Sequence, residues 1–147
     1  MLSLPAPVRD AALLLARIAI GVIFLAHGWQ KFFTNGIDGT TRFFTSAGVP
    51  VPGLSAWAAT VLELVGGGAL VLGVAVPVVG VLLALDMLGA FFFVHAGKGI
   101  FVAQGGWELV LALGVTSLLL AALGAGRLSV DHALFGRRSG TRTPQRV

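Results

Sequence analysis

LLLARIAIGVIFLAHGWQKFF, residues 13–33, is the stretch that decides the fold of this chain. As an α-helix it is about 31 Å long, which matches the hydrocarbon core of a bilayer. Four polar side chains interrupt it, at Arg17, His27, Gln30 and Lys31. A charge near the middle of a membrane helix costs about 2.5–3.5 kcal/mol on insertion scales, so it needs a partner or a function. We therefore expect further helices to enclose the polar face of this one.

The composition of the whole chain is that of a membrane protein. Of its 147 residues, 56% are hydrophobic and 11% are charged, whereas soluble domains have about 25% charged residues. The chain has no cysteine, which excludes disulfides, thiol catalysis and iron–sulfur ligation by its own side chains. In so hydrophobic a chain, the net charge of +4 indicates membrane topology and contact with membrane lipids, and no nucleic-acid partner is expected.

Four apolar segments are long enough to cross a bilayer, and they cover residues 13–33, 54–74, 78–96 and 107–123. Open strands would leave backbone groups unpaired in lipid, so each segment is predicted to be a helix. The sequence thus predicts an all-α membrane protein. Residues 1–147 form one domain, a four-helix transmembrane bundle, and residues 137–147 are predicted to be a disordered basic tail.

An even number of crossings places both termini on one side of the membrane. Arginines gather at the two ends of the chain, and the connections on the opposite side have fewer basic residues. The terminal arginines are Arg9, Arg127, Arg137, Arg138, Arg142 and Arg146, and the basic residues opposite are Lys31, Arg42 and Lys98. The positive-inside rule therefore predicts cytoplasmic termini in a multi-pass protein of the plasma (inner) membrane.

Ionisable residues inside the predicted helices indicate a site. At 1.5 Å per residue, Arg17 and Asp86 lie at similar depth, so we expect them to form a structural ion pair. Glu63 lies near the midplane, with His27 somewhat outside it. We expect the polar residues to line one outward-opening pocket, because intramembrane ionisable groups often mark ligand sites or proton relays. The alternative is that they only fix helix packing through interhelical pairs.

A metal site and a glycine-lined ligand site are also considered. His27, Glu63, His95 and Glu108 supply one metal-ligand type per helix, but they lack the His/Glu spacing of bundle metal sites and differ in depth, so no metal is predicted. Gly66, Gly67 and Gly68 allow close approach of another helix or a flat ligand.

An ordered set of residues resembles the DoxX family of small four-helix membrane proteins. The resemblance runs from residue 13 to residue 131. It consists of Arg17, HGWQKF at 27–32, Glu63 with the glycines after it and Gly73, Asp86–Met87, His95, Gly99, Phe101, Trp107–Glu108 and GAGRLSVD at 124–131.

The resemblance implies a quinone-linked redox role, since the family is named for its similarity to the DoxD subunit of thiosulfate:quinone oxidoreductase. On this hypothesis the chain is an accessory or subunit of a quinone-linked redox system. The catalytic candidates, which bind the ligand carbonyl or carry protons, are His27, Glu63, His95 and Glu108. The ligand-binding candidates are Arg17, Lys31, Gly66, Gly67 and Trp107. No haem or flavin motif is found, so electrons are expected to come from a redox-protein partner or a small reductant.

Two other function classes stay open. One is a non-catalytic scaffold that recruits redox or secreted proteins, through the connection at residues 34–53 and the arginine-rich tail. The other is a small-anion transporter with Arg17 and Lys31 as binding charges, for which a chain of this size needs a homo-oligomer. Whether the protein is an enzyme is not decided by the sequence.

Overall fold

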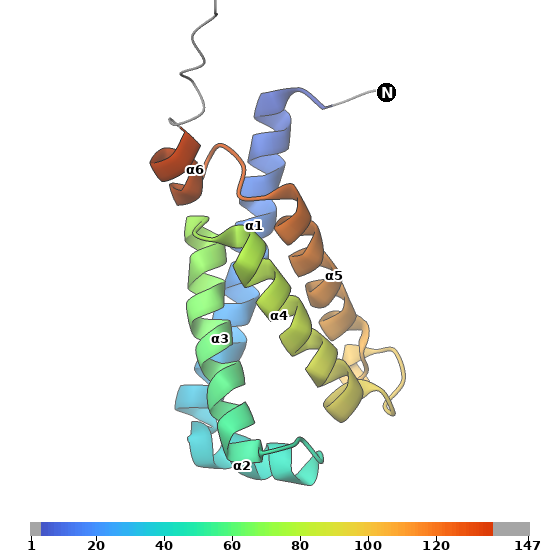
Figure 1. Ribbon diagram of the computed structural model, residues 1–147. Coiled ribbons are helices and arrows are strands. Elements are labelled where there is room, and N and C mark those ends of the chain that lie inside the picture. The colour runs from blue at the N-terminus through green and yellow to red at the C-terminus, as the bar shows by residue number, and fades with distance from the viewer. Residues whose placement is uncertain (1–3, 137–147) are drawn as a thin grey trace, which may run out of the picture.

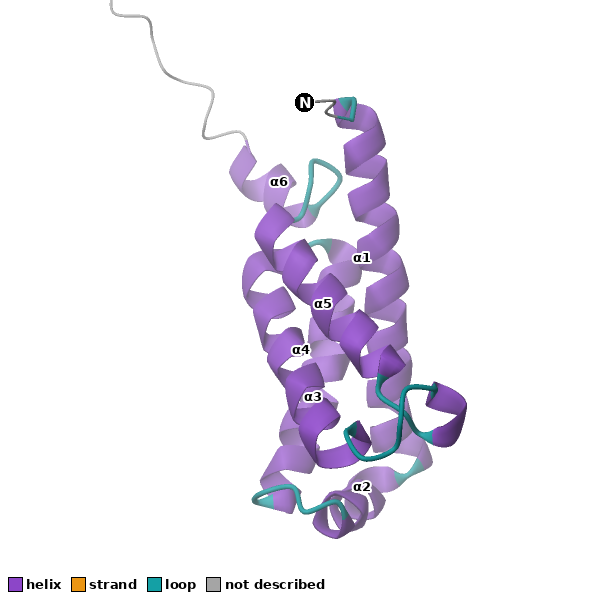
Figure 2. Ribbon diagram, turned by 90° about the vertical axis from the view of Figure 1, so that its right-hand side faces the viewer, coloured by secondary structure: helices purple, strands orange, loops and turns teal. Residues whose placement is uncertain are grey.

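All the elements in the computed structural model, which describes residues 4–136, are helical. Four long helices run alongside one another, with two short ones at the ends of the bundle (Figures 1 and 2). The long helices are α1 (Ala6–Trp29), α3 (Pro52–Leu72), α4 (Val76–Ala90) and α5 (Glu108–Leu123), and the short ones are α2 (Gly36–Ser46) and α6 (Val130–Phe135). The all-α prediction is confirmed.

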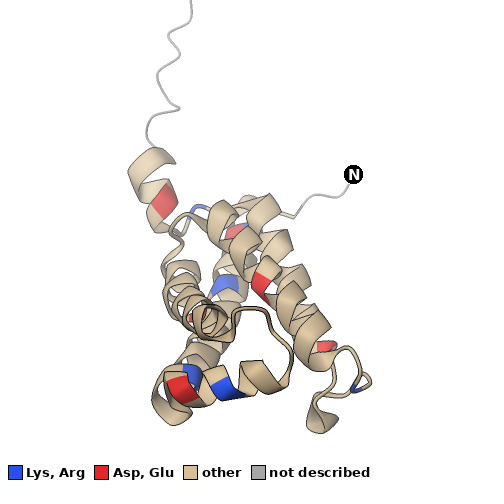
Figure 3. Ribbon diagram, turned by 60° about the horizontal axis from the view of Figure 1, so that its bottom comes forward, with Lys and Arg blue, Asp and Glu red and all other residues tan. Residues whose placement is uncertain are grey.

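Three stretches are long and apolar enough to cross a membrane: Ala6–Thr34, Pro52–Leu72 and Val76–His95. The fourth, α5, is apolar but shorter, at 16 residues. Large apolar side chains on the outside of the helices are well exposed, including Leu15 and Val65, and few positions on the ribbon are charged (Figure 3). A surface of this kind suits contact with lipid rather than with water.

The first helix begins earlier than residue 13, where the sequence pattern placed it. It starts at Ala6, with Pro5 as the N-cap. Pro7 lies in its first turn, where proline is tolerated because its missing N–H would be unpaired anyway. The helix continues into a π-helical turn, η1 (Gln30–Thr34), and α4 ends in the same way in η2 (Phe91–His95). A short 3₁₀ turn, η3 (Val102–Gln104), precedes α5. The tail predicted at residues 137–147 lies outside the described residues.

The start of α1 and helix α6 lie at one end of the bundle, and α2 lies at the other (Figure 1). The chain therefore leaves the bundle at the end where it entered. Which end faces the cytoplasm stays a prediction from the arginine distribution.

Small residues bring the helices into two close pairs. In the pair α1–α3, a Cβ added to Gly67 would lie 2.7 Å from the Gly21 carbonyl oxygen. In the pair α4–α5, a Cβ added to Gly80 would lie 2.6 Å from the Ser117 carbonyl oxygen. Backbones in such close contact are typical of membrane helix interfaces, where packing rather than the hydrophobic effect drives association.

A tight turn joins α3 to α4. Gly73 ends α3 with φ +75°, and Ala75 precedes α4 with φ +47°. From this turn the two helices diverge towards the end of the bundle where α2 lies (Figure 1).

Candidate functional site

Lys31 and Glu63 form an ion pair inside the bundle. The Lys31 Nζ donates to Glu63 Oε2 at 2.7 Å and to Oε1 at 2.9 Å. The Glu63 residue is only 2% exposed, whereas the Lys31 side chain is 20% exposed. The π-helical turn η1 supplies the lysine, and Thr40 of α2 donates to the Lys31 carbonyl at 3.0 Å. The buried carboxylate of Glu63 on α3 thus has the Lys31 ammonium group beside it, and the backbone of Lys31 is held by η1 and by the hydrogen bond from α2.

Asp86 of α4 faces this pair. Its carboxyl lies close enough to the Glu63 carboxyl and the Lys31 ammonium group to interact with both. Its Oδ2 atom is buried and has no hydrogen-bond partner among the described residues. Glu63 and Asp86 are equally far, about 15 Å at 1.5 Å per residue, from the turn that joins their helices. An antiparallel hairpin therefore brings them to the same level. Two carboxyls and one ammonium group form the charged centre of the bundle.

A cavity of about 490 Å³ opens beside these charges, between α2, α3 and α4. Lys31, Glu63, Asp86 and His95 are the ionisable residues in its wall. The rest is largely apolar, with three phenylalanines, Phe43, Phe44 and Phe93, among the lining side chains. The site therefore combines a few convergent polar groups with aromatic surface, which is the usual composition of a small-molecule pocket of this size.

His95 is oriented by the connection that follows it. Its Nδ1 lies 2.7 Å from the carbonyl oxygen of Gly105. A carbonyl only accepts, so Nδ1 carries the proton of this hydrogen bond. Residue His95 belongs to the π-helical turn η2, as Lys31 belongs to η1. Both long segments thus deliver a polar site residue from a π-helical turn, a feature that occurs frequently at functional sites.

His27 lies near the cavity but not in its wall. The residue is half-buried in α1, and it is within electrostatic range of Lys31 and His95. Among residues 4–136, no group of three His, Asp or Glu side chains is placed to hold a metal ion.

The predicted ion pair between Arg17 and Asp86 is wrong. Arg17 is 0% exposed and donates to the carbonyl oxygens of Leu128, at 2.5 Å, and Leu70, at 3.4 Å. It lies against Gly73, so it is level with the α3–α4 turn, about 15 Å along α4 from Asp86. The depth estimate failed because α1 extends beyond the residue where it was expected to begin. Arg17 links α1 to α3 and to the segment before α6 at that end of the bundle, and it does not reach the cavity.

Gly66 and Gly67 are packing residues in this structure. A Cβ at Gly66 would meet the Leu83 side chain of α4 at 3.3 Å, and one at Gly67 would meet the α1 backbone. Neither residue lines the cavity. Their assignment to ligand binding is therefore corrected to helix contact, the alternative that the sequence left open.

Glu108 and Trp107 also lie away from the cavity wall. The Glu108 Oε1 accepts a hydrogen bond from the Val102 backbone N–H at 2.8 Å, which holds the connection before α5. Trp107 packs edge-on against Phe91, with ring centroids 6.1 Å apart. Of the predicted site residues, the structure therefore brings Lys31, Glu63 and His95 together at the cavity. Asp86, which was predicted only as the partner of Arg17, joins them there.

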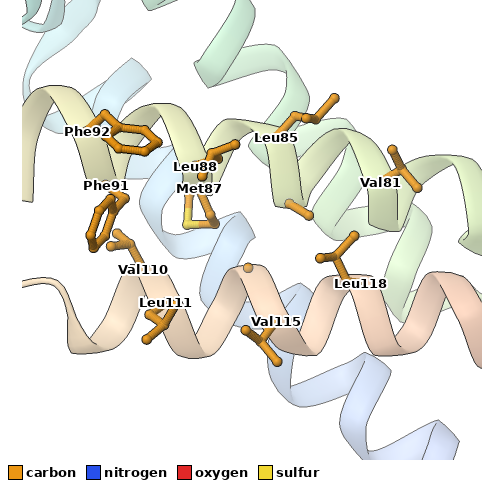
Figure 4. Close-up of a pocket in the computed structure, with 12 residues that line it drawn as sticks. Val81, Leu85, Met87, Leu88, Phe91, Phe92, Val110, Leu111, Val115 and Leu118 are labelled. Atoms are coloured by element: carbon orange, nitrogen blue, oxygen red, sulfur yellow. The ribbon is translucent and has the colours of Figure 1, made fainter.

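A second hollow lies between α4 and α5 and has no polar lining side chain. It measures about 310 Å³ and includes Met87, Phe91, Val110 and Leu118 (Figure 4). A groove of this kind offers shape and apolar surface but no group that can transfer a proton. We regard the cavity beside Asp86 as the candidate site.

Sequence reasoning missed the pairing of Asp86 with Glu63 and the contribution of α2. The first had a readable signal, because both carboxyls are equally far from the turn around Gly73 and Pro77. The phenylalanines of α2 had no such signal, since only the fold places them over the cavity.

A chain with these apolar spans and a charged centre is a multi-pass membrane protein. Comparison with known proteins identifies its family. Residues 12–96 match the DoxX family. The chain belongs to the DoxX family.

Relatives match over most of their length. The chain is 38% identical to "Putative oxidoreductase CatD" of Bacillus subtilis (strain 168), over 86% of this chain and 90% of that protein. It is 32% identical to "Inner membrane protein YphA" of Escherichia coli (strain K12), over 84% of this chain and 91% of that one. It is also 32% identical to "Uncharacterized membrane protein Rv3486" of Mycobacterium tuberculosis, over 82% and 80% of the two chains. No solved structure matches significantly. With its apolar helices, the protein is a multi-pass protein of the plasma membrane.

Proposed function

We propose that the protein binds a quinone-like ligand in the cavity between α2, α3 and α4, as a subunit or accessory of a membrane redox system. The observation that carries the proposal is the charged group Lys31–Glu63–Asp86 in the wall of a largely apolar cavity, in which Glu63 is buried and the other two are partly buried. Burying this many charges in a membrane helix bundle is costly, so a function in binding or proton transfer explains them better than packing does.

The cavity fits the chemistry of such a ligand. A quinone has a flat ring, one apolar tail and two oxygens, and it carries two electrons and two protons when reduced. The phenylalanines offer aromatic surface for the ring. Lys31 can donate a hydrogen bond to a ring oxygen, and His95 can accept one from a ring hydroxyl through Nε2. The carboxyls of Glu63 and Asp86 can hold or pass protons. A volume of about 490 Å³ lies in the range of small-molecule pockets.

The rest of the proposal concerns topology and partners. Helix α5 is taken as a fourth crossing, with both termini in the cytoplasm, so that the cavity opens near the outer surface. The chain has no cysteine, so any thiol or iron–sulfur step would belong to a redox-protein partner or to the small reductant itself. A relative bears the name of an oxidoreductase, which supports the redox class.

Transport of a small anion receives less support. Both cations assigned to that role have partners within the protein, because Arg17 donates to backbone carbonyls and Lys31 to a carboxylate.

The test is a mass-spectrometric analysis of lipids extracted from the protein purified in mild detergent. Gly89→Leu is the variant of choice, since a Cβ at Gly89 meets nothing within 4 Å and the residue lines the cavity. The new side chain occupies part of the cavity and leaves every charge in place. Glu63→Gln serves as the second variant, and Glu108→Gln as its control, because a glutamine oxygen can still accept the Val102 hydrogen bond.

We expect near-stoichiometric quinone with the wild type and with Glu108→Gln, and loss of it with Gly89→Leu and Glu63→Gln. Thermal unfolding of each variant distinguishes lost binding from lost folding. If the wild-type protein carries only bulk lipid, even when quinone is added before purification, the proposal is wrong. A non-catalytic scaffold would then be the better explanation.

A further inference from the structure

We infer that the cavity prefers the reduced, hydroxyl-bearing form of its aromatic ligand, a hydroquinone, over the oxidised quinone. The inference rests on the proposed function and goes one step further, because it names the oxidation state that the site recognises. It follows from the hydrogen-bonding groups in the wall, of which nearly all accept and few donate.

The imidazole of His95 supplies the first acceptor. Its Nδ1 proton is given to the Gly105 carbonyl oxygen at 2.7 Å. In the neutral ring, the other nitrogen, Nε2, then has a lone pair and no proton. Because His95 lines the cavity, a ligand that meets Nε2 must bring a hydrogen of its own. A hydroxyl has one, and a quinone carbonyl does not.

The two carboxyls supply further acceptors. The Asp86 Oδ2 atom is buried and has no hydrogen-bond partner among the described residues, and leaving such an atom unpaired costs free energy. A ligand hydroxyl would recover that free energy once the Asp86 side chain, which lines the cavity, turns this oxygen towards it. Both carboxylate oxygens of Glu63 accept from Lys31, and the carboxyl also lies within hydrogen-bonding range of Asp86. A carboxylate has about four lone-pair sites, so Glu63 still has acceptor capacity beyond these contacts. A proton shared between Glu63 and Asp86 would lie between the facing carboxyls, so it would not turn Oδ2 into a donor.

Most hydrogen-bond donors in the cavity wall already have acceptors within the protein. Lys31 directs two of its three ammonium protons at Glu63, which leaves one, and that proton can serve a carbonyl and a hydroxyl oxygen equally well. Ser55, which lines the cavity, donates its hydroxyl proton to the Pro50 carbonyl at 2.6 Å, so its oxygen can only accept from a ligand. A quinone carbonyl therefore finds one donor among several lone pairs, whereas a hydroquinone finds partners for both of its protons.

The test compares one ligand in two oxidation states. The probes are a short-chain, water-soluble dimethoxy-methyl-benzoquinone and its hydroquinone, titrated calorimetrically into the purified protein in detergent without oxygen. A hydroxyl–acceptor bond made in one state and lost in the other is equivalent to about tenfold in affinity. We expect the hydroquinone to bind at least about tenfold more tightly to the wild type.

Two variants locate the preference and one controls for charge. His95→Asn retains an N–H near the position of Nδ1 to hold Gly105 but has no counterpart of Nε2, and Asp86→Asn replaces an acceptor oxygen by a donor. Each should reduce the preference by about tenfold, the equivalent of one hydrogen bond. Asp38→Asn removes the same charge from the exposed surface of α2 and should leave the preference unchanged.

The outcomes separate the inference from the function on which it rests. Equal affinity for the two states, or tighter binding of the quinone, overturns the inference and leaves the proposed function standing. Absence of binding by either state overturns both. A preference that survives in both His95→Asn and Asp86→Asn would show that other groups cause it, and the assignment made here would be wrong.

Discussion

Replacing Lys31 by methionine removes the ammonium group beside the buried carboxyl of Glu63 and the partly buried carboxyl of Asp86. Met keeps most of the volume of the lysine stem, so the change acts mainly on charge. Breaking a buried ion pair by removing one partner costs about 3–5 kcal/mol, because the other charge stays buried and unpaired. Glu63 is 2% exposed, but the Lys31 side chain is 20% exposed, so we expect the lower end, about 3 kcal/mol.

This loss is measured as a thermal unfolding midpoint in detergent micelles, followed by tryptophan fluorescence. For a chain of this length, about 1 kcal/mol shifts Tm by roughly 2–4 °C, so Lys31→Met should lower it by about 6–12 °C. Lys98→Met is the matched control, because Lys98 is exposed and surface substitutions usually change stability by less than about 0.5 kcal/mol.

A double variant tests the reasoning itself. In Lys31→Met with Glu63→Gln, the unpaired carboxylate is gone, and we expect the double variant to be about 1–2 kcal/mol more stable than Lys31→Met alone. If the two single effects simply add, the residues are not coupled and the ion pair does not organise the site.

Three further predictions concern packing, fastening and topology. Gly67→Ala should lower the free energy of unfolding by about 1–3 kcal/mol, because the new Cβ would lie less than 3.0 Å from the α1 backbone. Gly68→Ala, whose Cβ would have no neighbour within 4 Å, should be neutral or stabilising by up to about 1 kcal/mol. Thermal unfolding of the two variants measures the difference. Arg17→Gln removes the hydrogen bond to the Leu128 carbonyl, so it should loosen the attachment of α6 and speed proteolysis near Leu128. Arg42→Gln, on the exposed surface, should leave the rate of proteolysis unchanged. Equal cleavage rates in the two variants would show that Arg17 does not hold α6 in place. Because the chain has no cysteine, single cysteines at Arg9 and Arg42 should react with an impermeant maleimide from opposite sides of the membrane, the first only from the cytoplasm.

The sequence was informative wherever a single segment carries the signal. An apolar run of membrane length is a helix whatever surrounds it, so the spans were predictable, as was the position of Glu63 inside one of them. The ordered set of residues was likewise enough for the family.

What could not be predicted depends on relations between segments. The partner of Arg17 depends on where α1 begins, and an extension to Ala6 moves the relative depth of every residue in that helix. The π-helical turns change which direction Lys31 and His95 face, and no periodicity in the apolar pattern announces them. A glycine in a membrane helix can serve helix contact or ligand binding, and the sequence alone does not tell which. At Gly66 and Gly67 the neighbouring helices in the fold show that the role is helix contact.

The central claim is that the cavity between α2, α3 and α4 holds the ring of a quinone-like ligand. The most direct measurement is photolabelling of the purified protein with an azido-substituted quinone, followed by mass-spectrometric mapping of the adducts in the wild type and in Gly89→Leu. The account predicts adducts within residues 43–63 and 82–95 of the wild type and their loss in the variant. Adducts confined to the α4–α5 groove around Val115 and Leu118 (Figure 4), unchanged by Gly89→Leu, would contradict it.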